Sequence, residues 1–301
     1  MFKRLIVYGL IILLGLGLTS CDLFWEDRHY SQVDYRLFKN TAVWPLAKLL
    51  DAEEMDEIRD FIRKNTFDLE TIERRYGQTL LMISVQKGQV KATQALLEAG
   101  ANPNAHTAYN GSSPMLEAAR LQNPEADNTV ILKLLLAHKG NPNDETLVSI
   151  QDGTIEKETP LLIACGDVTQ TLHPVEKAKV LVEAGAEINY VNPNSKTPLL
   201  RAIEFNHFDT ALYLLEHGAD YKRLVADRSQ YMESGQKVYL VHILREKIVP
   251  MESIQYRQKM QVVDFLSQKG IHYRNEPVPP AIQEKIKLLY PAHYQDYLNR
   301  Y

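Results

Sequence analysis

A nine-residue segment recurs along this chain and limits what the chain can fold into. Five copies begin at Leu96 (LLEAGANPN), Leu135 (LLAHKGNPN), Leu181 (LVEAGAEIN), Leu214 (LLEHGADYK) and Leu266 (LSQKGIHYR). Each copy starts with apolar residues at helical spacing and continues into a glycine and turn-forming residues, which is typical of the end of an α-helix. This recurrence predicts a stack of similar small units rather than one continuous core.

A second motif precedes four of these segments. Its copies begin at Gln78 (QTLLMIS), Ser112 (SSPMLEAA), Glu158 (ETPLLIAC) and Lys196 (KTPLLRAI). Thr159 and Thr197 each place a capping hydroxyl before a proline at the first helical position, where a missing N–H costs nothing. Each unit is therefore predicted to be a turn, a helix, a short connection and a second helix. Neither helix can bury its apolar stripe alone, so we expect the units to stack.

Together the two motifs resemble the ankyrin repeat, whose signature is T-P-L-H-x-A with a period of about 33 residues. The resemblance covers residues 77–222 as four repeats and continues into a degenerate fifth repeat at residues 223–276. It implies an all-α ankyrin-repeat solenoid of stacked helix pairs, in which turn segments called fingers join successive pairs. The histidine of the family motif is replaced here by apolar residues, namely Met82, Leu116, Leu162 and Leu200. Apolar packing must therefore replace the polar link of that histidine.

The two ends of the repeat region are predicted to be helical caps. Residues 46–76 should form a first helix pair with a charged outer face, and residues 277–301 a single cap helix. Tyr294, Tyr297 and Tyr301 lie near one face of that helix, where they either pack or bind. Between the caps, the segment Asp144 to Glu158 should lengthen one finger. The helix-ending glycines are expected to be left-handed at Gly100, Gly140, Gly185 and Gly218.

The first twenty residues read as a targeting segment. Lys3 and Arg4 precede an apolar run that ends at Leu18, and small residues lead to Cys21. This ending resembles the bacterial lipoprotein processing signal, which implies cleavage and a lipid on Cys21, with residues 21–45 as a tether and lead-in. An uncleaved N-terminal anchor is the alternative. Both interpretations predict a cell-envelope protein facing the periplasm, with the choice between inner and outer membrane left open.

The sequence contains few of the motifs that indicate catalysis or the binding of metals and phosphates. It contains no H-E-x-x-H, no C-x-x-C, no phosphate-binding glycine loop and no nucleophile elbow. Cys165 lies in an apolar helical pattern and is expected to be a buried small residue. The formal net charge of -4 does not favour nucleic acid as a partner. We therefore expect a monomer without enzymatic activity, cofactor or metal.

Stacked repeats present a groove that commonly binds other proteins. The resemblance places finger residues and exposed positions of the first helices along that groove, and tyrosine and arginine often anchor interfaces. The candidate partner-binding residues are His106, Tyr109, Asn110, Glu117, Arg120, Tyr190, Asn192, Arg201, Glu204 and Tyr221. Alternatively, the asparagines and tyrosines only serve the turns. The predicted function is a protein-binding module, either an immunity protein that neutralises an antibacterial effector encoded nearby or a scaffold for an envelope or stress-defence enzyme.

Overall fold

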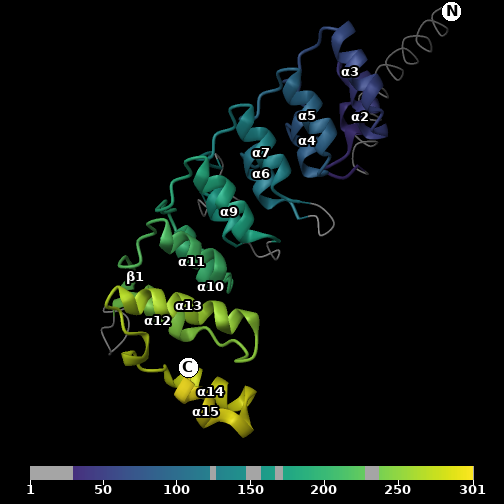
Figure 1. The fold of residues 1–301 in the computed structure, drawn as a ribbon. Coiled ribbons are helices and arrows are strands. Elements are labelled where there is room, and N and C mark those ends of the chain that lie inside the picture. Colours follow the sequence, from purple (N-terminus) through teal and green to yellow (C-terminus); the bar gives the residue numbers. More distant parts are fainter. Residues whose placement is uncertain (1–29, 123–126, 147–156, 167–171, 228–236, 301) are drawn as a thin grey trace, which may run out of the picture. The chain divides into compact units, whose positions relative to one another are not determined.

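The computed structural model describes residues 30–122, 127–146, 157–166, 172–227 and 237–300. Two compact units make up this part of the chain, one through Pro114 and one from Met115 onward. The elements, labelled in Figure 1, are η2 (Tyr35–Phe38), α2 (Trp44–Ala52), α3 (Met55–Lys64), α4 (Leu80–Gln86), α5 (Val90–Glu98), α6 (Pro114–Arg120), α7 (Val130–Ala137), α8 (Pro160–Ala164), α9 (Pro174–Glu183), α10 (Pro198–Glu204), α11 (Phe208–Glu216), β1 (Leu224–Asp227), β2 (Lys237–Tyr239), α12 (Leu240–Glu246), α13 (Ile254–Gln268), η3 (Tyr273–Asn275), α14 (Pro280–Leu289), η4 (Pro291–His293) and α15 (Tyr294–Arg300).

Short antiparallel helix pairs form both units. In the first unit, α2 packs on α3 and α4 on α5. In the second, α8 pairs with α9 and α10 with α11, and like helices also touch their neighbours, α8 to α10 to α12 and α7 to α9 to α11 to α13. Two layers of helices therefore share a continuous core within this unit, as the repeated sequence motifs predict.

Three first helices, α4, α8 and α10, begin at a threonine hydroxyl cap. The Oγ1 atom of Thr159 accepts from Leu162 N at 3.3 Å, and that of Thr197 accepts from Leu200 N at 3.1 Å. Thr79 caps α4 in the same way. In these three helices, the residue that replaces the family histidine thus donates its backbone N–H to the cap hydroxyl, and its side chain is buried. The four side chains at this position are all at most 4% exposed: Met82, Leu116, Leu162 and Leu200.

The helix ends follow the predicted left-handed pattern with one exception. Gly100, Gly185 and Gly218 have φ values of 95°, 89° and 95°. Gly140 was also expected to be left-handed, and this prediction is wrong, because Lys139 takes the positive φ of 70°. Gly140 stands one position later, where a Cβ would lie 2.8 Å from the carbonyl oxygen at the end of α7. A glycine is needed here for close approach rather than for a left-handed turn.

Substitutions of these two glycines should destabilise the fold for two different reasons. A Cβ at Gly185 would meet nothing within 4 Å, so Gly185→Val should lower the free energy of unfolding by about 1 kcal/mol through backbone strain alone. Gly140→Ala should cost at least as much, because its Cβ would also lie 2.7 Å from Met115 Sδ. Urea unfolding measures both variants. If both unfold like the wild type, the helix ends are assigned in the wrong register.

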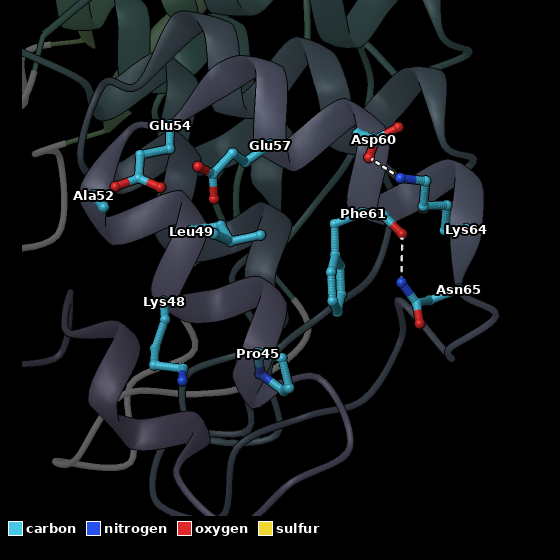
Figure 2. A pocket seen from close by; sticks show the side chains of 10 residues that line it. All are labelled: Pro45, Lys48, Leu49, Ala52, Glu54, Glu57, Asp60, Phe61, Lys64 and Asn65. Atoms are coloured by element: carbon cyan, nitrogen blue, oxygen red, sulfur yellow. Dashed lines mark hydrogen bonds and ion pairs between the residues drawn. The ribbon is translucent and has the colours of Figure 1, made fainter.

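The first helix pair carries an open groove on its surface. This hollow between α2 and α3 has a volume of about 610 Å³. Figure 2 shows that Leu49 and Phe61 line it among charged side chains. The facing carboxyl groups of Glu54 and Glu57 share a hydrogen bond, which raises the pKa of Glu57 above its usual value. Such a charged face is typical of a terminal repeat. The fold begins before residue 46, because η2 buries Tyr35 and Phe38.

The C-terminal part differs in detail from the sequence prediction. The fifth unit opens with an antiparallel hairpin, β1 and β2, ahead of α12 and α13. The expected single cap helix at residues 277–301 is two helices, α14 and α15, because Pro291 begins a new turn between them. Tyr297 packs rather than binds: it is fully buried beside Ile286, and its hydroxyl bonds to the backbone of Val249. Tyr301 lies outside the described residues.

Candidate functional site

A buried residue at the root of each of four fingers holds the backbone of that finger. Glu73 is 1% exposed and its carboxylate accepts from Arg75 N at 2.6 Å, Tyr76 N at 2.7 Å and Gln78 N at 2.9 Å. Equivalent positions in the later fingers carry Thr107, Thr146 and Asn192, each of which accepts a backbone N–H of its own finger. The described parts of these four fingers are therefore held in fixed turns, so less conformational entropy is lost when a partner binds to them.

Two of the candidate binding residues belong to this support. Asn192 is 4% exposed, and its Oδ1 accepts from Lys196 N at 2.8 Å. Asn110 Oδ1 accepts from Thr107 Oγ1 at 2.5 Å and from Ser112 N at 3.2 Å. Both asparagines thus serve the turns, which is the alternative that the sequence left open. Their backbone role explains why the sequence could not separate them from binding residues.

Other asparagines join one finger to the next. Asn143 donates to Gly185 O at 3.0 Å and accepts from Glu187 N at 2.6 Å. Asn189 repeats the pattern one unit later, with Gly218 O at 3.2 Å and Asp220 N at 2.8 Å. The finger spacing in the second unit is therefore fixed by paired hydrogen bonds.

A chain of ion pairs runs over the first helices of the second unit. Glu158 bridges two arginines, at 2.8 Å to Arg120 and 3.2 Å to Arg201. Arg120 also lies 3.5 Å from Glu117, and Arg201 donates to the carbonyl of Gly166 at 3.2 Å. Side chains from α6, α10 and the end of the long finger are thereby held in one arrangement. The charged side chains of Arg120, Glu158 and Arg201 are partly shielded from water, which strengthens the attraction between opposite charges.

These ion pairs correct the expectation that the candidate side chains on the first helices are exposed in the groove. The side chains of Glu117 and Arg201 are only 14% and 12% exposed. Glu204 is likewise engaged, by Lys196 at 2.5 Å. Helices of successive repeats stack closely enough for their charged residues to meet, and this cannot be read from one repeat alone. Glu158 was missed as a site residue for that reason, although its place directly before the Thr-Pro cap was a usable signal.

The candidate tyrosines and the histidine have different surroundings. Tyr109 is 54% exposed and meets Tyr76 edge to face at 5.4 Å. Tyr190 bonds to the carboxylate of Glu145; burial and this bond raise the pKa of Tyr190. His106 Nδ1 bonds to the backbone of its own finger. Tyr221 is half-buried and lines a hollow of about 470 Å³ beside Tyr239.

Groups of metal-binding side chains and the thiol of Cys165 are the features of the described residues that bear on chemistry. Among them, no group of three or more histidine, cysteine, aspartate or glutamate side chains is placed to hold a metal ion. Cys165 is fully buried, and burial raises the pKa of its thiol, which makes it a poor nucleophile. What the geometry offers is a set of rigidly held polar and aromatic side chains on stacked units.

The paired helices and their fingers match known repeat sequences. Residues 76–108 match the model of the ankyrin repeat, and residues 125–224 match a model that contains three ankyrin repeats. These segments are ankyrin repeats. The expected fold class, an all-α ankyrin-repeat solenoid, is confirmed. Ankyrin repeats generally act as protein-interaction modules.

Two curated ankyrin proteins are similar to parts of this chain. An ankyrin repeat and KH domain-containing protein of Caenorhabditis briggsae is 29% identical over 153 residues, which are 45% of this chain and 6% of that protein. A putative ankyrin repeat protein of Acanthamoeba polyphaga mimivirus is 35% identical over 80 residues, 25% of this chain and 48% of that protein. This chain therefore spans less than half the length of either curated relative.

Two solved ankyrin structures share the fold. The human ASB11 ankyrin repeat domain has a TM-score of 0.53 at 17% identity, covering 78% of this chain and 92% of that one. An ankyrin repeat domain from Acinetobacter baumannii has a TM-score of 0.53 at 22% identity, covering 75% and 98%. At such low identity the likeness concerns the arrangement of helices alone.

Proposed function

We propose that this chain is a non-catalytic protein-binding module that holds a partner on the fingers and first helices of its ankyrin repeats. The observation that carries the proposal is the ion-pair chain through Glu158. It fixes charged side chains of separate repeats before any partner arrives, so less conformational entropy is lost on binding. A surface of fixed charges also selects its partner by electrostatic complementarity.

The finer proposal is a lipid-anchored immunity protein of a bacterial envelope. Support comes from the N-terminal sequence, where Lys3, Arg4, the apolar run and Cys21 follow the order of a lipoprotein signal. Residues 1–29, including Cys21, lie outside the described part of the structure. Among the described residues, no helix is both long and apolar enough to cross a membrane. A tethered binder suits the neutralisation of an effector that arrives in the periplasm. A scaffold for an envelope enzyme is the second candidate, since it needs the same surface.

The anchor gives a direct prediction. Cys21→Ser removes the thiol that would carry lipid, so the variant should lose fatty-acid label and leave the membrane fraction or accumulate uncleaved. Metabolic labelling with a radioactive fatty acid, followed by fractionation, measures both effects. A wild-type chain without label would refute the lipid anchor.

Partner binding is tested with the full chain and the product of the neighbouring gene. The double variant Arg120→Gln with Glu158→Gln should weaken their complex at least tenfold, because it removes the central ion pair of the chain. Its melting temperature should fall little, since partly exposed ion pairs stabilise a fold by about 1 kcal/mol or less. The matched control, Asp60→Asn with Lys64→Gln, breaks an ion pair in the hollow between α2 and α3 (Figure 2) and should leave binding unchanged.

The outcome also separates the two candidate roles. A partner that is toxic when expressed alone in the periplasm, and harmless beside this chain, indicates immunity. A harmless partner that loses its own activity without this chain indicates a scaffold. A complex that forms equally well with the double variant and its control would show that the ion-pair chain is not the binding surface.

A further inference from the structure

Two successive fingers of the first unit line a hollow of about 340 Å³. One finger contributes residues 72–77 and the next contributes residues 108 and 109. The side chains that define this finger pocket are Ile72, Arg74, Arg75, Tyr76, Ala108 and Tyr109. A hollow of this size holds one or two side chains of a partner.

Buried hydrogen bonds and close packing hold the walls of the finger pocket in place. Three backbone N–H groups of the first finger point at the buried carboxylate of Glu73. The two fingers also approach closely, since a Cβ at Gly77 would lie 3.1 Å from Ala108 N. Gly77 has a φ of 66°, which only glycine adopts readily. The pocket therefore exists before any ligand enters it.

The pocket exposes apolar area to water. Ile72 is 53% exposed and Tyr109 is 54% exposed, and each belongs to a different finger. The ring of Tyr109 meets Tyr76 edge to face, and the guanidinium of Arg75 lies 5.0 Å from the centre of the Tyr76 ring. A rigid cluster of aromatic, aliphatic and arginine side chains has the composition of an interface hot spot.

The charge of the pocket is positive although the chain is acidic. Arg74 and Arg75 are both exposed at its edge, whereas the one carboxylate in its lining, that of Glu73, is buried and accepts three backbone hydrogen bonds. The chain as a whole carries a formal net charge of -4. This local reversal of sign favours a negatively charged ligand here.

We propose that the finger pocket binds an acidic segment of the partner protein. An aromatic or aliphatic side chain of that segment packs between Ile72 and Tyr109, and a neighbouring carboxylate pairs with Arg74 and Arg75. The proposal rests on the proposed function, because it supplies the chemistry of the partner that such a module would hold.

The test uses a random peptide library displayed on phage and selected against the full chain. Selected peptides should place Asp or Glu next to an aromatic or aliphatic residue. A synthetic copy of such a peptide should bind Tyr109→Ala at least tenfold more weakly, as loss of a hot-spot residue predicts. The double variant Arg74→Glu with Arg75→Glu should weaken binding by a similar factor, and wild-type binding should fall as salt rises.

Two controls keep the outcome clear. Tyr239→Ala removes a tyrosine of comparable type, 36% exposed, from the hollow beside Tyr221, and should leave peptide binding unchanged. Melting temperatures report whether each variant is folded. The proposal is overturned if no peptide is enriched, if the selected peptides are basic, or if the pocket variants bind as tightly as the wild type.

A failure of this proposal can be distinguished from a failure of the proposed function. If acidic peptides bind the finger pocket but the neighbouring gene's product forms no complex, the proposed partner fails and the pocket remains. If that complex forms while the library result is negative, only the finger pocket is refuted.

Discussion

Replacing Glu73 with alanine is expected to lower the free energy of unfolding by about 3 to 4 kcal/mol. The carboxylate is 1% exposed and accepts three backbone N–H groups, those of Arg75, Tyr76 and Gln78. Alanine would leave these donors without an acceptor in a site that water enters poorly. Urea unfolding followed by circular dichroism measures the loss.

Glu70 provides the matched control for this variant. It lies three residues earlier, is exposed, and accepts a single backbone N–H, from Asn102 at 2.8 Å. Glu70→Ala should therefore cost less than about 1 kcal/mol, because water can replace its carboxylate. Equal losses for Glu73→Ala and Glu70→Ala would show that the buried carboxylate does not hold the finger.

Stability is also expected to rise with pH above about pH 8 because of Lys177. Its side chain is fully buried, and its ammonium donates to the carbonyls of Ala119 at 2.9 Å and Leu121 at 2.6 Å, at the end of α6. Burial disfavours the charged form and lowers the pKa of Lys177 from 10.5 to about 8. The folded chain therefore gives up this proton more easily than the unfolded chain.

The sign of the effect follows from proton binding. Between about pH 8 and pH 10.5 the unfolded chain binds more protons at Lys177, so the free energy of unfolding rises with pH by about 1.4 kcal/mol per pH unit from this group. Compared with Lys177→Met, the wild type should gain about 2 to 3 kcal/mol between pH 7 and pH 10. Subtracting the variant removes the contributions of other titrating groups.

Lys179 supplies the control on the same helix. It is exposed, so Lys179→Met should leave the difference between pH 7 and pH 10 as in the wild type. Parallel pH profiles for the wild type and Lys177→Met would show that the ammonium is not buried in solution.

The repeat architecture could be predicted because its signals are local. A hydroxyl followed by proline, as at Thr159 and Thr197, starts a helix whatever surrounds it, and a glycine after apolar helical residues ends one. Even the exception was visible in the sequence. The second copy of the recurring segment carries lysine at its fifth position and glycine at its sixth, so Lys139 had to take the left-handed conformation.

The polar contacts could not be predicted because they depend on which side chains meet after stacking. Arg120 and Arg201 were expected to be available to a partner, but both pair with Glu158, which lies in the intervening repeat. The role of Glu73 depends on a turn that folds its own amides back onto the carboxylate. Sequence spacing specifies neither contact. Tyr109, one of the candidate finger residues, is 54% exposed, and this too became clear only from the structure.

The base of the long finger has a consequence for how such a chain diversifies. Thr146 N donates to Glu158 O at 3.1 Å, and Glu158 N donates back to Thr146 Oγ1 at 3.0 Å. These two hydrogen bonds close the long finger at its base. Each doubling of the length of a closed loop lowers the free energy of unfolding by only about 0.6 kcal/mol. The two ends of the long finger therefore stay joined whatever length of sequence lies between them, so the finger can be lengthened or shortened at little cost to the stability of the repeats.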